Sequence, residues 1–161
     1  EILESMTLFF STTVADDEEK KAIRRRSIAV IDENFETFVK TSIPNLFSNN
    51  EKDILEGKIE LAKNIAKSTD KEGVKAAQLG MAERPDRTEI LENLDAKILI
   101  IAGKYDNAVK TENLLKIIPE KTNIKTYVLD CGHNGHWEKP TICAEIINTE
   151  LLHNLPKHFL L

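Results

Sequence analysis

The stretch KILIIAGKYDNAV, residues 97–109, decides the fold of this chain. After its first lysine comes a continuous apolar run that ends at Gly103. Such runs are typical of a central strand in a parallel sheet, because both faces of that strand are buried. Asp106 follows three residues after the glycine. The stretch therefore predicts a buried parallel strand with a carboxylate just beyond its carboxyl end.

The residues after this stretch predict a second strand and two helices. Thr111 opens a short helical segment, and IKTYVLD (124–130) is a second candidate strand. Pro140 stands where a first-turn proline opens a last helix. The predicted inner face of that helix consists of Ile142, Ile146 and Ile147. The order strand, helix, strand, helix implies right-handed crossovers and a parallel sheet, so we predict an α/β fold.

A helical block precedes the stretch at 97–109. MTLFF (6–10) is short, apolar and aromatic, which is typical of a buried strand. Between residues 15 and 85 no strand pattern occurs, and apolar residues recur at helical spacing. One predicted helix carries its apolar face at Ile28, Ile31, Phe35, Phe38 and Val39. Capping boxes, which mark helix starts, are predicted at Asp16 with Glu19 and at Thr69 with Glu72.

These patterns divide the chain into three segments. We assign residues 1–14 to a core strand, 15–83 to a helical cap or lid, and 84–161 to the C-terminal part of the core.

Charge and composition bear on the kinds of partner. The net charge is −5, and the chain is 41% hydrophobic and 30% charged, which is ordinary for a globular protein. Because nucleic acid and anionic membranes need a basic face, we expect neither as a partner. The basic run within 20–26 follows the acidic run 16–19, which predicts a solvated helix with paired charges. No apolar stretch approaches the roughly 20 residues that span a bilayer.

The two cysteines, Cys131 and Cys143, do not form a Cys-x-x-Cys motif. This usage predicts reduced thiols in a cytoplasmic protein. Neither cysteine lies in the electropositive surroundings that activate a thiol, so neither is a convincing nucleophile.

Two side chains suited to proton transfer follow the two predicted strands. Asp106 leaves the first strand, and His133 lies three residues past Asp130 in CGHNGHWEKP (131–140). Function gathers at the carboxyl ends of parallel strands, so these two side chains can approach each other. A carboxylate that accepts from one imidazole nitrogen fixes the tautomer. The other nitrogen is then free to take a proton from a nucleophile.

Simpler interpretations of the same residues stay open at this point. Asp106 could be a turn residue that bonds its own backbone, and His133 could be structural or exposed. A metal site at His133 and His136 is disfavoured, because their spacing falls in a glycine loop and no cysteine or acid cluster completes a ligand set. Glu138 is interpreted as a residue near the start of the last helix.

The order strand, Gly-x-x-Asp, helix, strand, Gly-His loop, Glu-Lys-Pro, helix resembles the C-terminal half of the α/β-hydrolase superfamily. LFFSTTVADDEEKK is similar to the strand and start of the cap in the small esterase-like members. RPDRTEILENLDAKILIIAGKYDNAV is similar to their passage from the cap back to the sheet. The resemblance covers nearly the whole chain and is most specific at 84–109 and 127–140.

The resemblance implies roles for five residues. Asp106 matches the triad acid and His133 the triad base. His136 and Trp137 fall where the family lines its substrate site beside the histidine. Phe10 falls at a third substrate-site position, where many relatives carry a polar histidine. The implied chemistry is hydrolysis of a small acyl ester, for which we expect no cofactor.

The nucleophile of that family is absent from this sequence. It stands in Gly-x-Ser-x-Gly, ahead of the acid and the histidine, and none of the six serines has a glycine two residues away. The chain also begins with Glu1 and enters an apolar run almost at once. We therefore expect a fragment that is inactive alone. Its exposed sheet would be covered by a missing N-terminal half or by self-association.

Two other functions stay open from the sequence. The chain could be a non-catalytic binding or assembly module that keeps half of a hydrolase fold. It could also belong to a hydrolase that uses an aspartate nucleophile, of the dehalogenase or epoxide hydrolase type. Nothing in these residues separates the last alternative from a serine enzyme.

Overall fold

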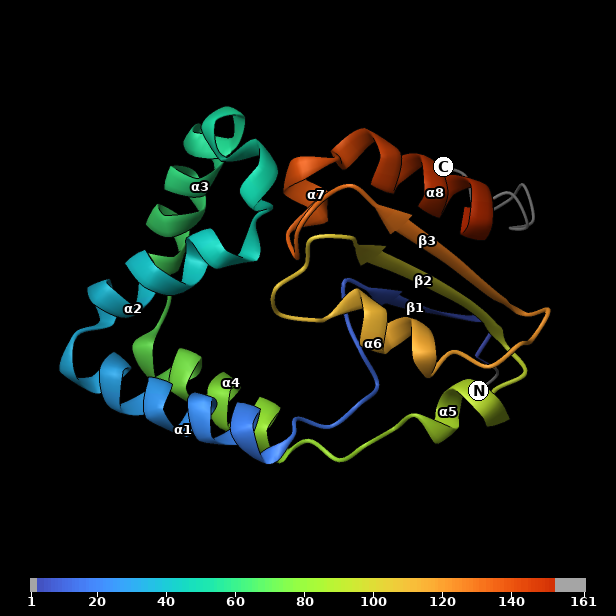
Figure 1. Ribbon diagram of the computed structural model, residues 1–161, viewed down its shortest axis with the longest axis horizontal. Helices are drawn as coiled ribbons and strands as arrows, with labels where there is room; N and C mark the ends of the chain where they lie inside the picture. The colour runs from blue at the N-terminus through green and yellow to red at the C-terminus, as the bar shows by residue number, and fades with distance from the viewer. Residues whose placement is uncertain (1–2, 153–161) are drawn as a thin grey trace. The chain divides into compact units, whose positions relative to one another are not determined.

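The computed structural model describes residues 3–152, which divide into two compact units (Figure 1). The helical unit is Thr13–Asn93, and the sheet unit is made of the segments before and after it.

A parallel sheet of three strands organises the sheet unit. The strands are β1 (Ser5–Phe9), β2 (Lys97–Gly103) and β3 (Ile124–Leu129), in the order β1-β2-β3. Leu8 pairs with Ile100 in one ladder, and Ile101 pairs with Tyr127 in the other. Residues 98–103 of the central strand are all buried, which accounts for its unbroken apolar run. The predicted α/β fold class is therefore confirmed.

Helices lie on both faces of this sheet. Figure 1 shows α8 (Pro140–Leu151) along one face and α6 (Thr111–Lys116) along the other. A third, short helix, α7 (Gly135–Glu138), precedes α8. The core under α8 contains Phe10, Leu99, Ile101, Cys131, Cys143 and Ile146. Two of its members, Phe10 and Cys131, lie just beyond the carboxyl ends of β1 and β3.

The predicted inner face of α8 was wrong at one position. Ile142 is 44% exposed, whereas Cys143, Ile146 and Glu150 are buried. Positions 143, 146 and 150 share one helical face, and residue 142 lies about 100° away from the first of them. A buried glutamate therefore occupies a position that apolar periodicity could not predict.

The helical unit contains the following elements: α1 (Glu18–Glu33), α2 (Phe35–Ser42), η1 (Ile43–Leu46), η2 (Asn49–Glu51), α3 (Lys52–Lys67), α4 (Lys71–Glu83) and α5 (Glu89–Asn93). The single helix expected through Val39 is two helices. Asn34 ends α1 and caps α2, since its side chain accepts the N–H of Thr37 at 2.9 Å.

The predicted capping residues were each one position early. Asp17, not Asp16, caps α1, and its carboxylate accepts the N–H of Lys20 at 2.7 Å. Asp70, not Thr69, caps α4. Asp16 is instead buried and pairs with Arg24 and Arg84. Neighbouring residues of similar capping strength are separated only by their backbone angles, and the sequence does not show these.

Residues 84–93 lie in the helical unit, beyond the predicted boundary at 83. Hydrogen bonds explain this extension. The N–H of Arg87 donates to the carbonyl of Thr13 at 2.9 Å, and the N–H of Ala15 donates to the carboxylate of Asp86 at 3.2 Å. These bonds join the two ends of the helical unit.

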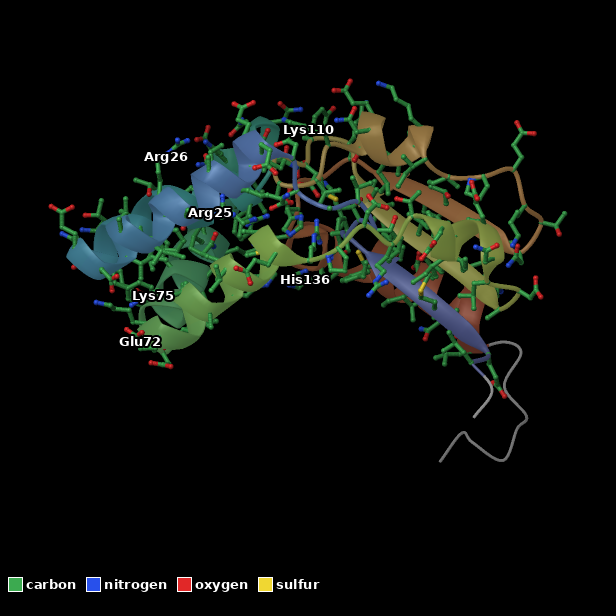
Figure 2. The ribbon with its side chains drawn as sticks, turned by 90° about the horizontal axis from the view of Figure 1, so that it is seen from below. Arg25, Arg26, Glu72, Lys75, Lys110 and His136 are labelled. Carbon is green, nitrogen blue, oxygen red and sulfur yellow. The ribbon has the colours of Figure 1, made fainter. Side chains whose placement is uncertain are left out.

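The surface of the helical unit is charged where the sequence predicted a solvated helix. Arg25 and Arg26 are exposed on α1 (Figure 2). On α4, Lys75 pairs with Glu72 at 3.0 Å, and it also reaches Asp32 of α1 at 2.7 Å. Within residues 3–152, no helix is both long and apolar enough to cross a bilayer.

A buried carboxylate near the end of α8 predicts a pH dependence of stability. Glu150 accepts hydrogen bonds from Tyr127 Oη at 2.6 Å and Lys125 Nζ at 3.1 Å, and it pairs with Lys97. These donors, Tyr127 first, lower the pKa of Glu150 from 4.5 to about 2. Charged Glu150 therefore stabilises the fold above about pH 4.5, and this contribution disappears as the pH falls toward 2.

We expect Glu150→Gln to lower the thermal unfolding midpoint at about pH 6, with the difference from wild type shrinking steadily toward about pH 2.5. Circular dichroism at several pH values measures both midpoints. Glu145→Gln, an exposed change on the same helix, is the matched control and should not show this convergence. A difference for Glu150→Gln that stays constant with pH would contradict the assignment.

Candidate active site

The loops that leave β2 and β3 are joined by their backbones. The N–H of Lys104 donates to the carbonyl of Leu129 at 2.8 Å, and the N–H of Tyr105 donates to the carbonyl of Cys131 at 3.0 Å. A Cβ atom at Gly103 would lie 2.2 Å from the carbonyl oxygen of Gly132. Only glycine permits so close an approach of two backbones. The approach places the residues that follow each strand beside one another.

Asp106 is both a turn residue and a partner of His133. One carboxylate oxygen, Oδ1, accepts the N–H groups of Ala108 and Val109 at 2.7 and 2.8 Å. The other oxygen, Oδ2, lies 2.9 Å from Nδ1 of His133. The side chain of Asp106 is only 1% exposed. The turn therefore holds the carboxylate by one oxygen and leaves the other aimed at the imidazole.

The hydrogen bond decides which nitrogen of His133 carries the proton. An ionised carboxylate can only accept, so Nδ1 must donate. In the neutral imidazole, Nε2 then has a free lone pair that can take a proton. The side chain of His133 is 29% exposed, in contrast to the buried Asp106. This arrangement suits a histidine that acts as a base while a buried carboxylate orients it.

The structure places Phe10 beneath the loop that carries His133. Its N–H donates to the carbonyl of Ile101 at 2.8 Å, and its φ of 49° is in the left-handed region. This conformation costs a non-glycine residue on the order of 1–3 kcal/mol. A Cβ atom at Gly135 would lie 1.9 Å from the ring of Phe10, which is itself only 4% exposed. Phe10 thus supports the loop from below.

His136 and Trp137 lie on α7, close to His133. The ring of His136 is 6.0 Å from that of Phe9 and 6.3 Å from that of Trp137. His136 is exposed (Figure 2), and Trp137 is half-buried. Partial desolvation, followed by the nearby charge of His133, lowers the pKa of His136 below its usual value. His136 therefore favours its neutral form.

The two cysteines are buried free thiols. Burial raises the pKa of Cys131 to about 12 and also raises that of Cys143. Because the thiolate is the reactive form, both side chains are inert packing residues of the core.

Glu138 is a residue of this region that the sequence interpretation undervalued. It is 7% exposed, and its Oε1 accepts the N–H of Gly132 at 2.9 Å. Glu138 ends α7, a helix of four residues, which is too short to give a periodic signal of such a contact.

Comparison with known proteins gives matches at the level of structure. Neither a protein-family model nor a curated protein matches the chain. A thermophilic esterase from Thermogutta terrifontis is 29% identical with a TM-score of 0.81, and the match covers 93% of this chain and 56% of the esterase. The chain has an α/β-hydrolase fold. The resemblance predicted from its sequence is therefore confirmed for the fold.

Two further structures with the hydrolase fold agree. The enol-lactonase from Burkholderia xenovorans is 16% identical with a TM-score of 0.77, covering 93% of this chain and 56% of the lactonase. An α/β hydrolase from a Medee basin deep-sea metagenome library is 17% identical with a TM-score of 0.73, covering 95% and 57%. This hydrolase-fold chain thus spans little more than half the length of the structures it matches.

Proposed function

We propose that this chain carries the acid and the base of a serine hydrolase that cleaves small acyl esters. The hydrogen bond of 2.9 Å between Asp106 and His133 is the observation that carries the proposal. The two side chains follow adjacent parallel strands, which is where open α/β sheets place their sites. Similarity to an esterase at 29% identity supports the choice of ester substrates.

In each of the two steps of the proposed reaction, His133 takes up a proton and then passes it on. Nε2 takes the proton of the serine hydroxyl as its oxygen bonds to the ester carbonyl carbon. The same proton then goes to the departing alcohol oxygen, leaving an acyl-serine. Water then attacks the acyl-serine with His133 again as the base, which releases the carboxylic acid and the free serine. Asp106 holds the tautomer and stabilises the imidazolium that forms in each step.

The serine is proposed to come from a segment outside this sequence. None of the serines here stands in Gly-x-Ser-x-Gly, the turn that exposes such a nucleophile. Among the described strands, β1 pairs only with β2, so its other edge can accept a further strand. We propose that a preceding segment of the whole protein, or else a second chain, pairs there. The chain alone is then expected to be inactive.

Substrate choice is proposed to rest on two parts of the chain. His136 and Trp137 flank His133 and would line the acyl or alcohol side of the substrate. The helical unit is proposed to act as a cap that selects the substrate. No metal, cofactor or nucleic acid enters the proposed reaction.

The test compares this chain with the longer product of its gene. We expect hydrolysis of p-nitrophenyl acetate or butyrate by the longer product and none by residues 1–161 alone. A fluorescent organophosphonate should label a serine in the longer product only. Turnover by the short chain alone would contradict the proposal. So would a longer product that neither hydrolyses esters nor becomes labelled, and that result would favour the non-catalytic module.

A further inference from the structure

A buried hydrogen bond closes the loop that carries His133. The N–H of Gly132 donates to Oε1 of Glu138 at 2.9 Å. Both partners are buried, and Glu138 is 7% exposed. His133 is the next residue after Gly132, so the direction in which its backbone leaves the sheet depends on where this N–H is held.

Backbone hydrogen bonds hold each end of the loop. On one side, the carbonyl of Cys131 accepts the N–H of Tyr105. On the other, the carbonyl of Asn134 accepts the N–H groups of Trp137 and Glu138 at 2.8 and 3.1 Å, which forms α7. The carboxylate of Glu138 joins these two parts, because it reaches from α7 to the residue before His133.

The hydrogen bond between Gly132 and Glu138 depends on distance and angle. A carboxylate is a stronger acceptor than a neutral group, and its bond to an N–H is short and aligned. A buried N–H that loses its partner finds no water in its place, so the backbone must move to satisfy it. The contact between His133 and Asp106 weakens steeply once its distance or angle departs from hydrogen-bonding geometry.

We propose that Glu138 is a positioning residue that aims His133 at Asp106 by holding the N–H of Gly132. The inference rests on the proposed function only in taking His133 to be the catalytic base. The geometry itself is a property of the sheet unit and can be measured without substrate or nucleophile.

Three variants of Glu138 distinguish the effect of side-chain length from the effect of charge. Glu138→Ala removes the acceptor, and Glu138→Asp keeps the charge but shortens the side chain by one methylene. Glu138→Gln keeps the length and a carbonyl oxygen but removes the charge. Glu145→Ala, an exposed change on α8, is the matched control. Circular dichroism establishes that each variant is folded.

Proton NMR of the chain gives the readout. The signal of the hydrogen-bonded Nδ1–H of His133 is assigned by its loss in His133→Gln. We expect this signal in wild type, Glu138→Gln and Glu145→Ala, and its loss in Glu138→Asp and Glu138→Ala. Hydrogen exchange of the Gly132 amide should speed up at least about tenfold in the same two variants.

The proposal is overturned if Glu138→Asp and Glu138→Ala keep both the signal and the protected amide. It is equally overturned if Glu138→Gln loses them while Glu138→Asp keeps them, since charge would then matter instead of the hydrogen bond. Should Glu138→Ala fail to fold, the comparison of Glu138→Asp with Glu138→Gln decides alone. If the chain shows the expected NMR changes but the longer product does not hydrolyse esters, the proposed function is contradicted and this inference stands.

Discussion

His133→Ala in the longer, active product is expected to reduce kcat for p-nitrophenyl esters about 10⁶-fold. Nε2 of His133 is the group placed to accept the proton of the attacking hydroxyl, because Nδ1 is occupied by Asp106 at 2.9 Å. Without that base the serine attacks as a neutral alcohol, which is a weak nucleophile. KM should change little, since the imidazole acts in the transition state rather than in substrate binding.

Lys104→Ala is the matched control for this variant. Lys104 leaves β2 on the loop that leads to Asp106, and its ammonium pairs with the exposed Asp130 at 3.3 Å. Surface pairs of this kind contribute little, so activity and folding should stay close to wild type. Ester hydrolysis that survived His133→Ala within about tenfold of wild type would remove His133 from the proposed mechanism.

The central strand could be predicted because it is buried on both faces, whereas the side chains of β1 are half-buried and several of β3 are exposed. The run at 98–103 has no polar position, which is typical of a strand in the middle of a parallel sheet. Its pairing with β1 and β3 then follows from the right-handed crossovers that join parallel strands. Few strands are available to pair with the central strand, and the observed order β1-β2-β3 follows the order of the sequence.

The encounter of Asp106 with His133 was predictable for the same reason. Carboxyl ends of neighbouring parallel strands lie at one edge of the sheet, so residues three positions beyond β2 and four beyond β3 can meet there. The expected meeting needs only the strand assignments, and the distance of 2.9 Å agrees with it. The sequence left open whether Asp106 closes its own turn instead, and the structure shows that the same carboxylate does both, through the N–H groups of Ala108 and Val109.

The details that escaped prediction depend on contacts between distant or competing groups. Asp16 and Asp17 are equally good capping residues in isolation. The arginines at 24 and 84 draw Asp16 into a buried ion pair and leave the cap to Asp17. The sequence likewise does not distinguish Glu138 from other charged residues, because its contact with the backbone of Gly132 forms only in the folded structure. Such choices are made by tertiary structure, which local pattern does not contain.

Asp106→Asn is expected to lower kcat of the longer product about 10⁴-fold while leaving the fold intact. Two backbone N–H groups, of Ala108 and Val109, hold Oδ1. An asparagine must keep its carbonyl oxygen at that position, because an NH₂ group there would face two donors. Its NH₂ group then takes the place of Oδ2 and donates to Nδ1 of His133. The proton moves to Nε2, the nitrogen that should receive one from the serine.

The expected loss of kcat comes from the wrong tautomer of His133, so removing a nearby carboxylate that does not contact His133 should leave kcat unchanged. Asp130→Asn removes an exposed carboxylate at the end of β3 and its surface pair with Lys104, and we expect kcat within about twofold of wild type. Nitrogen NMR of the labelled imidazole should show the proton on Nδ1 in wild type and on Nε2 in Asp106→Asn. An Asp106→Asn enzyme that keeps wild-type turnover, or whose imidazole keeps its proton on Nδ1, would refute the orienting role of Asp106.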